Sequence, residues 1–235
     1  MHQLPLPVRL RATSVFSSYF AGSNQDAVRL LEQQQFGVSP LVFLYGVHGT
    51  GKTHLLQAAC VQASSVGQQA TYIALSDLQS YGTELLTAST HNAILCVDDV
   101  DSLLVDAEWN HALFSAYREL DEHQGRLILA ASQPPAAFRI PLADLSSRVL
   151  AGTVLRLNAL NENEQLHALQ LHALQRGLEL PEETALYLLR RLTRDMSTLC
   201  GFIEKLDIVS LAEQRKLTVP FVKKVLDKNI EDSNF

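Results

Sequence analysis

Short, nearly continuous apolar runs alternate with longer amphipathic stretches through the first two thirds of the chain. Runs of this kind are typical of parallel strands that are buried on both faces of a sheet. The strand-like runs lie at residues 41–45, 70–74, 93–98, 126–132 and 153–157. Because helical stretches separate them, the pattern predicts a doubly wound α/β domain with a parallel five-stranded sheet.

The helical stretches between these runs carry their apolar positions on one side. Residues 52–66 place Leu55 and Ala59 on one face, and Gly67 follows as a suitable C-cap. Residues 108–123 show the same amphipathic period. We therefore expect helices over both segments, packed against the sheet.

After residue 157 the strand-like runs stop and only helical patterns follow. These patterns cover residues 161–176, 181–194, 196–214 and 220–227. Asn161 and Glu164 form a capping-box pattern at the start of the first one. The proline-containing N-terminus has no helical period and reads as an extended tail. We expect the tail at 1–12, the α/β domain at 13–157 and a small all-helical domain at 158–235.

The charge balance bears on the class of partner. The chain has a net charge of −6 and a pI near 5.7. Proteins that bind DNA phosphates usually carry a basic face, so we expect protein partners and no direct sequence-specific DNA binding. No apolar run approaches the roughly 18 residues that span a bilayer, and the N-terminus lacks a secretory pattern. We therefore expect a cytoplasmic protein without a membrane segment.

Residues 46–53, Gly-Val-His-Gly-Thr-Gly-Lys-Thr, fit the pattern G-x-x-x-x-G-K-[ST] between a predicted strand and a predicted helix. The glycines let backbone N–H groups turn toward phosphate oxygens, and the helix N-terminus adds its positive end. Lys52 would reach the terminal phosphates, and the Thr53 hydroxyl would ligate Mg²⁺. The expected nucleotide contacts are Gly46, His48, Gly49, Thr50, Gly51, Lys52, Thr53 and His54. The alternative is a glycine-rich turn that precedes a helix by chance.

A pair of acidic residues follows another predicted strand. Asp98 and Asp99 come directly after the apolar run that begins at Ile94. At the carboxyl end of a parallel strand, these carboxylates should emerge beside the phosphate loop. Asp98 would then hold Mg²⁺, and Asp99 would orient or deprotonate an attacking water. An ordinary acidic turn is the alternative interpretation.

Two further positions follow from the same geometry. Ser132 ends a predicted strand, where it could touch the γ-phosphate or the attacking water, or simply cap the strand end. Arg148 is far from the phosphate loop in the sequence and is suited to act as an arginine finger on the nucleotide of another subunit. Its alternative is a surface ion pair with Asp144.

These motifs together resemble the AAA+ domain of the bacterial replication initiator DnaA over residues 13–228. The resemblance implies that the turn containing Phe20 and Asn24 lies against the adenine. It also implies a phosphate-contacting arginine in the helical lid. Ser197 stands at the position expected for that arginine, and Arg194 could replace it or remain a solvated helix-end side chain.

The N-terminal tail indicates which group of DnaA-like proteins this sequence resembles. Gln-Leu-Pro-Leu-Pro at residues 3–7 fits the Q-L-x-L-P pattern of peptides that bind the sliding clamp. Its expected clamp contacts are Gln3, Leu4, Leu6 and Pro7. No helix-turn-helix DNA-binding domain follows the lid in this sequence. The combination resembles the Hda family of DnaA-homologous regulatory inactivators.

The resemblance implies a negative regulator of replication initiation. Such a protein binds ADP or another nucleotide with Mg²⁺ and, with the DNA-loaded clamp, stimulates hydrolysis of the ATP bound to DnaA. Because the lid position holds Ser197, we expect weak or absent ATPase activity of its own. The alternative is an AAA+ ATPase that acts on DNA or loads a helicase; a small-molecule kinase would not need the helical lid. Association into homo-oligomers stays open.

Overall fold

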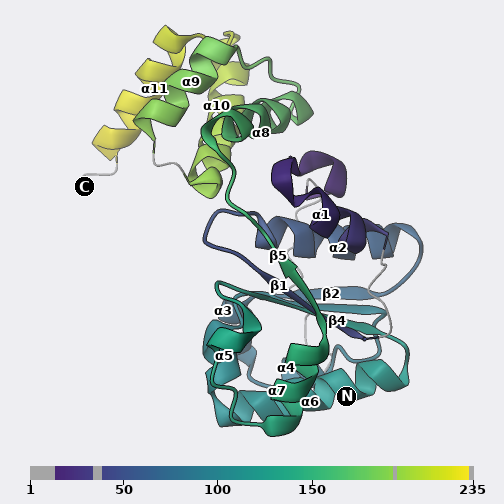
Figure 1. The fold of residues 1–235 in the computed structure, drawn as a ribbon. Coiled ribbons are helices and arrows are strands. Elements are labelled where there is room, and N and C mark those ends of the chain that lie inside the picture. The colour runs from purple at the N-terminus through teal and green to yellow at the C-terminus, as the bar shows by residue number, and fades with distance from the viewer. Residues whose placement is uncertain (1–13, 34–38, 193–194, 233–235) are drawn as a thin grey trace. The chain divides into compact units, whose positions relative to one another are not determined.

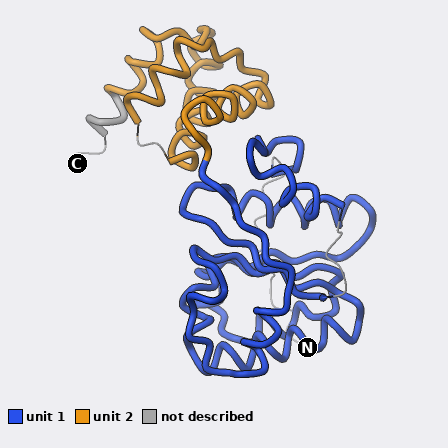
Figure 2. Tube along the Cα trace, in the orientation of Figure 1, with its two compact units in different colours: residues 1–159 blue, residues 160–235 orange. Residues whose placement is uncertain are grey.

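The computed structural model describes residues 14–33, 39–192 and 195–232, with side chains described as far as residue 227. The chain forms two compact units, residues 1–159 and residues 160–235 (Figure 2). Each unit has its own buried apolar core.

A parallel sheet of five strands forms the centre of the first unit, in the order β2-β3-β4-β1-β5. The strands are β1 (Leu41–Tyr45), β2 (Ala70–Ile73), β3 (Ile94–Val97), β4 (Arg126–Ala131) and β5 (Thr153–Arg156). Each lies within one of the five predicted runs, so the predicted α/β fold class is confirmed. Because all strands run the same way, the segments that follow β1, β3 and β4 emerge at one edge of the sheet.

Helices cover both faces of this sheet (Figure 1). Alternate residues of β1 face opposite sides: Val42 packs with α1 (Gln25–Glu32) and α2 (Lys52–Ser65), and Phe43 packs in the core on the other face. The helices on that second face are α3 (Leu75–Tyr81), α4 (Glu84–Thr87), α5 (Asp101–Val105), α6 (Ala107–Glu122) and α7 (Ala143–Ala151). The short 3₁₀ turns are η1 (Phe16–Ser18), η2 (Gly22–Asn24) and η3 (Pro135–Ala137).

Helices α2 and α6 were predicted to within two residues at each end. The sequence pattern gave no sign of α1, α3, α4, α5 and α7, which have nine residues or fewer. A helix of about two turns repeats its apolar face too few times for the period to be recognised.

The second unit is all helical. Its helices are α8 (Glu162–Gln175), α9 (Glu182–Arg191), α10 (Met196–Glu213) and α11 (Val219–Asp232). The predicted capping box is present: Glu164 N–H donates to Asn161 Oδ1 at 3.0 Å, and Asn161 N–H donates to Glu164 Oε2 at 2.9 Å. Within the described ranges, no helix is long and apolar enough to cross a membrane.

Candidate functional site

The loop between β1 and α2 contains the sequence-predicted phosphate-binding pattern. Its backbone enters the left-handed region at Gly49, with φ +79°, and at Gly51, with φ +86°. A Cβ atom on Gly51 would lie 2.5 Å from the Tyr19 ring. The position therefore requires glycine both for its backbone conformation and for the close approach of that ring.

Lys52 is the first residue of α2, and its side chain turns back over the loop. Its Nζ donates hydrogen bonds to the carbonyl oxygens of Gly46 at 2.8 Å and Val47 at 3.4 Å. The residue is only 8% exposed. A nearly buried ammonium group and the N-terminus of a 14-residue helix thus add positive charge at the same loop. This arrangement can bind an anion.

Asp98, directly after β3, reaches the adjacent Thr53. Thr53 Oγ1 donates to Asp98 Oδ2 at 2.6 Å, and the Tyr72 hydroxyl donates to the same oxygen at 3.0 Å. Asp98 is 2% exposed, and burial raises the pKa of its carboxyl group. The hydrogen bond from Thr53 opposes this rise, repulsion from Asp99 adds to it, and the bond from Tyr72 again opposes it.

The side chain of Asp99 points away from that of Asp98. Its φ of +54° lies in the left-handed region, which aspartate tolerates better than most residues. Its side chain is exposed, and its N–H donates to Asp98 Oδ1 at 3.1 Å. The turn thus places one carboxylate against Thr53 and the other toward solvent.

Ser132, directly after β4, contacts a carboxylate that the sequence interpretation passed over. Its hydroxyl donates to Asp101 Oδ1, and its N–H lies 3.1 Å from both oxygens of the same side chain. Asp101 lies in the first turn of α5. The only sequence signal was that Asp101 belongs to the same acidic run as Asp98 and Asp99.

The segment that precedes α1 is tied to the phosphate loop by side chains. The Tyr19 hydroxyl donates to the carbonyl of Thr50 at 2.8 Å, and burial raises the pKa of Tyr19 to about 12. Asn24 is 2% exposed and pairs with the backbone of Asn158: its Nδ2 donates at 3.0 Å, and its Oδ1 accepts at 2.7 Å. Asn24 therefore links this segment to the chain just beyond β5.

His54 follows the phosphate-loop threonine, and its ring contacts the same segment. Its Nε2 lies 3.0 Å from Ser18 Oγ and 3.0 Å from the carbonyl oxygen of Val15. Of the other predicted contacts, Phe20 is half-buried and His48 is exposed.

Arg148 lies in the last turn of α7, on the sheet face opposite α2, with an exposed side chain. Its Cζ lies 5.9 Å from the centre of the Tyr117 ring. Among the described residues it forms no ion pair with Asp144, which was the alternative left open by the sequence. Arg148 is not in hydrogen-bonding contact with the phosphate loop of the described chain.

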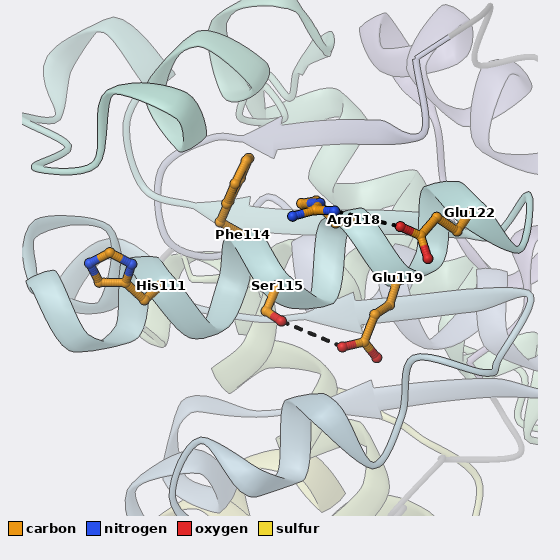
Figure 3. Close-up of a pocket in the computed structure, with 6 residues that line it drawn as sticks. All are labelled: His111, Phe114, Ser115, Arg118, Glu119 and Glu122. Carbon is orange, nitrogen blue, oxygen red and sulfur yellow. Dashed lines mark hydrogen bonds and ion pairs between the residues drawn. The ribbon is translucent and has the colours of Figure 1, made fainter.

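Two shallow hollows lie on the outer face of α6, away from the phosphate loop. Figure 3 shows the first, where the side chains all project from α6 and Arg118 pairs with Glu122 at 3.7 Å. Its lining residues are His111, Phe114, Ser115, Arg118, Glu119 and Glu122. The second hollow shares Phe114, Arg118 and Glu122 and adds Tyr117 and Arg148. The second hollow therefore includes Arg148, and neither hollow is lined by a residue of the phosphate loop.

Some predicted positions lie outside the described residues. These are Gln3, Leu4, Leu6, Pro7 and Arg194. Ser197 is described, and it lies exposed in the first turn of α10.

Comparisons with known proteins agree with this architecture. Residues 12–156 match the family model of the bacterial DnaA ATPase domain, and residues 162–226 match that of the Hda lid domain. Domain III of the replication initiation protein DnaA from Thermotoga maritima is similar with a TM-score of 0.73 and 20% identity, over 93% of this chain and 98% of that one.

Two further solved structures are also similar. A replication initiator DnaA bound to AMPPCP and single-stranded DNA has a TM-score of 0.69 and 25% identity, over 84% of this chain and 66% of that one. The Thermotoga maritima RuvB Holliday junction branch migration motor has a TM-score of 0.60 and 17% identity, over 88% and 67%. These likenesses confirm the predicted AAA+ fold.

Proposed function

This chain belongs to the bacterial DnaA ATPase domain family, and on that basis we propose that it is a nucleotide-bound AAA+ regulator of replication initiation. The observation that carries the proposal is the 2.6 Å hydrogen bond between Thr53 and Asp98, beside the nearly buried Lys52 ammonium group. A hydroxyl and a carboxylate at this distance, next to a fixed positive charge, suit a magnesium-bound phosphate chain.

Each loop residue has a separate role in binding. Lys52 exchanges its two carbonyl partners for the terminal phosphate oxygens. Thr53 Oγ1 and Asp98 provide hard oxygen ligands, which fits Mg²⁺. When bound, Mg²⁺ neutralises part of the phosphate charge. The segment around Phe20 and Asn24 holds the base, which we propose to be adenine, and the retained nucleotide is ADP.

We further infer that hydrolysis by the chain itself is weak. Ser132 points its hydroxyl at Asp101, and Asp99 has an exposed side chain that does not contact Thr53. The Ser132 hydroxyl hydrogen is thus donated to Asp101 and not to a phosphate oxygen. Ser197, exposed in the first turn of α10, stands where the family places a phosphate-contacting arginine. Both observations support a binding role for this site more than rapid turnover.

The partner is the ATP-bound initiator. The related DnaA with 25% identity binds AMPPCP, an ATP analogue, in its solved structure. The exposed guanidinium of Arg148 supplies positive charge to the γ-phosphate of the initiator's ATP, where it stabilises the transition state of hydrolysis. Gln3, Leu4, Leu6 and Pro7 recruit the protein to the DNA-loaded sliding clamp, so the initiator is inactivated after synthesis has begun.

The test measures ADP formed by ATP-loaded initiator in the presence of clamp on DNA, with and without this protein. Arg148→Ala should lower the stimulated rate by roughly 10³-fold, or to background. Arg29→Ala is the matched control, because Arg29 is also an exposed helical arginine but lies on α1, at the opposite face of the sheet. It should leave the rate unchanged.

Two further variants test nucleotide binding and clamp binding separately. Lys52→Ala should abolish the rise in melting temperature that Mg²⁺ and ADP cause in the wild-type protein. Gln3→Ala should weaken clamp binding without changing nucleotide binding. If the wild-type protein leaves initiator hydrolysis unchanged but hydrolyses ATP itself when DNA is added, the DNA-acting AAA+ alternative replaces this proposal.

A further inference from the structure

Arg148 is held by an element whose backbone has little freedom. Leu145 and Val149, on either side of it in α7, are both fully buried in the core beneath the helix. The helix therefore cannot rotate to redirect the arginine. The orientation of the guanidinium then depends on the flexible side chain alone, and ordering such a side chain costs conformational entropy.

Tyr117 provides a rigid surface beneath that side chain. It is 5% exposed, belongs to the same core cluster and projects from α6. Its ring stacks on Phe114, with ring centres 6.2 Å apart and an interplanar angle of 14°. The Arg148 Cζ stands 5.9 Å from the centre of this ring, within the range of a cation–π contact.

The charged side chains around the contact could have held the arginine instead. Asp144 lies one turn earlier on α7, and Asp121 and Glu122 line the same hollow. Among the described residues, however, none of these carboxylates forms an ion pair with Arg148. A carboxylate partner would neutralise the guanidinium and occupy its N–H donors, whereas an aromatic ring contacts its face and leaves the donor edges available.

We propose that Tyr117 is the positioning residue for Arg148: its ring holds the guanidinium plane so that the N–H edge is presented to a terminal phosphate on a docking nucleotide-bound protein. This inference rests on the proposed function. Burial and Asp121 raise the pKa of Tyr117 while Arg148 opposes them, so the phenol stays protonated and the ring contributes as a neutral face.

The first experiment is a double-mutant cycle read by the rate of partner ATP hydrolysis. Tyr117→Leu removes the ring and should lower the maximal stimulated rate roughly fivefold, with little change in the protein concentration needed for half-maximal stimulation. In the Arg148→Ala background, the same change should have no further effect. If the loss of rate in the double variant equals the combined losses of the two single variants, the proposal is overturned.

The lid offers a matched control for the loss of an aromatic ring. Arg191 Cζ also lies 5.9 Å from the centre of a tyrosine ring, that of Tyr187. Tyr187→Leu removes a cation–π contact of the same length at a site outside the proposed interaction. It should leave the stimulated rate within about twofold of the wild type.

A second series keeps the fold even if Tyr117→Leu does not. Tyr117→Phe retains the ring and should retain the rate within about twofold. Phenylalanine analogues with increasing ring fluorination at position 117 keep nearly the same size but weaken the negative ring face. The rate should fall stepwise along this series, and a flat series would overturn the inference.

The two proposals fail in different ways. If Arg148→Ala has no effect on partner hydrolysis, the proposed function fails. If Arg148→Ala removes stimulation but the fluorinated series is flat and the cycle shows no coupling, only the positioning role of Tyr117 fails.

Discussion

The hydroxyl of Tyr72 donates a hydrogen bond of 3.0 Å to Asp98 Oδ2, the same oxygen that accepts the Thr53 hydroxyl at 2.6 Å. Tyr72 comes from β2, the strand beside β3, and is itself buried. Its pKa is raised by burial and by Asp98, so it stays protonated and remains a donor. The buried carboxylate is therefore oriented toward Thr53 by a residue from another strand.

Tyr72→Phe should destabilise the protein by about 1.5–3 kcal/mol at neutral pH, because a buried ionised carboxylate loses a donor. The lost hydrogen bond lowers the pKa of Asp98 in the wild type, so the variant carboxyl should bind a proton more readily. The difference between variant and wild type should consequently shrink as pH falls and Asp98 becomes protonated in both. Urea unfolding at several pH values measures this.

Tyr81→Phe is the control for that measurement. Tyr81 is 43% exposed, and the described chain shows no hydrogen bond from its hydroxyl. Its replacement should leave the free energy of unfolding within about 0.5 kcal/mol. Equal effects of the two tyrosine substitutions would exclude the role assigned to Tyr72.

Gly51→Ala tests the close approach of Tyr19 to the phosphate loop. Gly67→Ala is its matched control, since Gly67 has a similar φ of +78° but no atom within 4 Å of an added Cβ. The control should cost about 1 kcal/mol of stability, from backbone strain alone. Gly51→Ala should cost about 1–3 kcal/mol more, because the Tyr19 ring has to move.

The same pair of variants separates stability from binding. Moving the ring breaks the hydrogen bond from Tyr19 to Thr50, so Gly51→Ala should also weaken the binding of Mg²⁺ and ADP, measured by calorimetry. Gly67→Ala should bind as the wild type does. A Gly51→Ala protein with unchanged stability and affinity would show that the ring contact is unimportant.

The partly buried ring of His54 should make the protein less stable in acid. Burial lowers its pKa, although its hydrogen bond with Val15 opposes this, so the folded state keeps the ring neutral. As pH falls through about 6.5, the unfolded chain binds a proton that the folded chain does not. Its stabilising contribution is thus present above that pH and declines below it, by up to about 1.4 kcal/mol per pH unit.

His54→Gln should therefore flatten the fall in the free energy of unfolding between about pH 7 and pH 5. Guanidinium unfolding across this range, with His111→Gln as the control, measures the effect. His111 is exposed on α6. A wild-type slope that persists in the His54 variant would place the acid sensitivity elsewhere.

The features that could be predicted from the sequence depend on residues that are close together along the chain. The five strands were recognisable because parallel strands buried on both faces are apolar over consecutive residues. The phosphate loop was recognisable because its glycines, Lys52 and Thr53 act together within one short stretch of consecutive residues. The fully local capping box of Asn161 and Glu164 was predicted to the residue.

The side chains that complete the site from distant segments could be identified only from the folded chain. Tyr72 and Asp98 are 26 residues apart, Asp101 and Ser132 are 31 apart, and Asn24 and Asn158 are 134 apart. Each pair meets because the order β2-β3-β4-β1-β5 brings together segments that are remote along the chain. The contact between Tyr117 and Arg148 depends likewise on how α6 packs beside α7. A hydrogen bond or ring contact of this kind involves one polar or aromatic residue in each segment. A single residue produces no repeating pattern in the sequence, so its partner cannot be predicted from either segment alone.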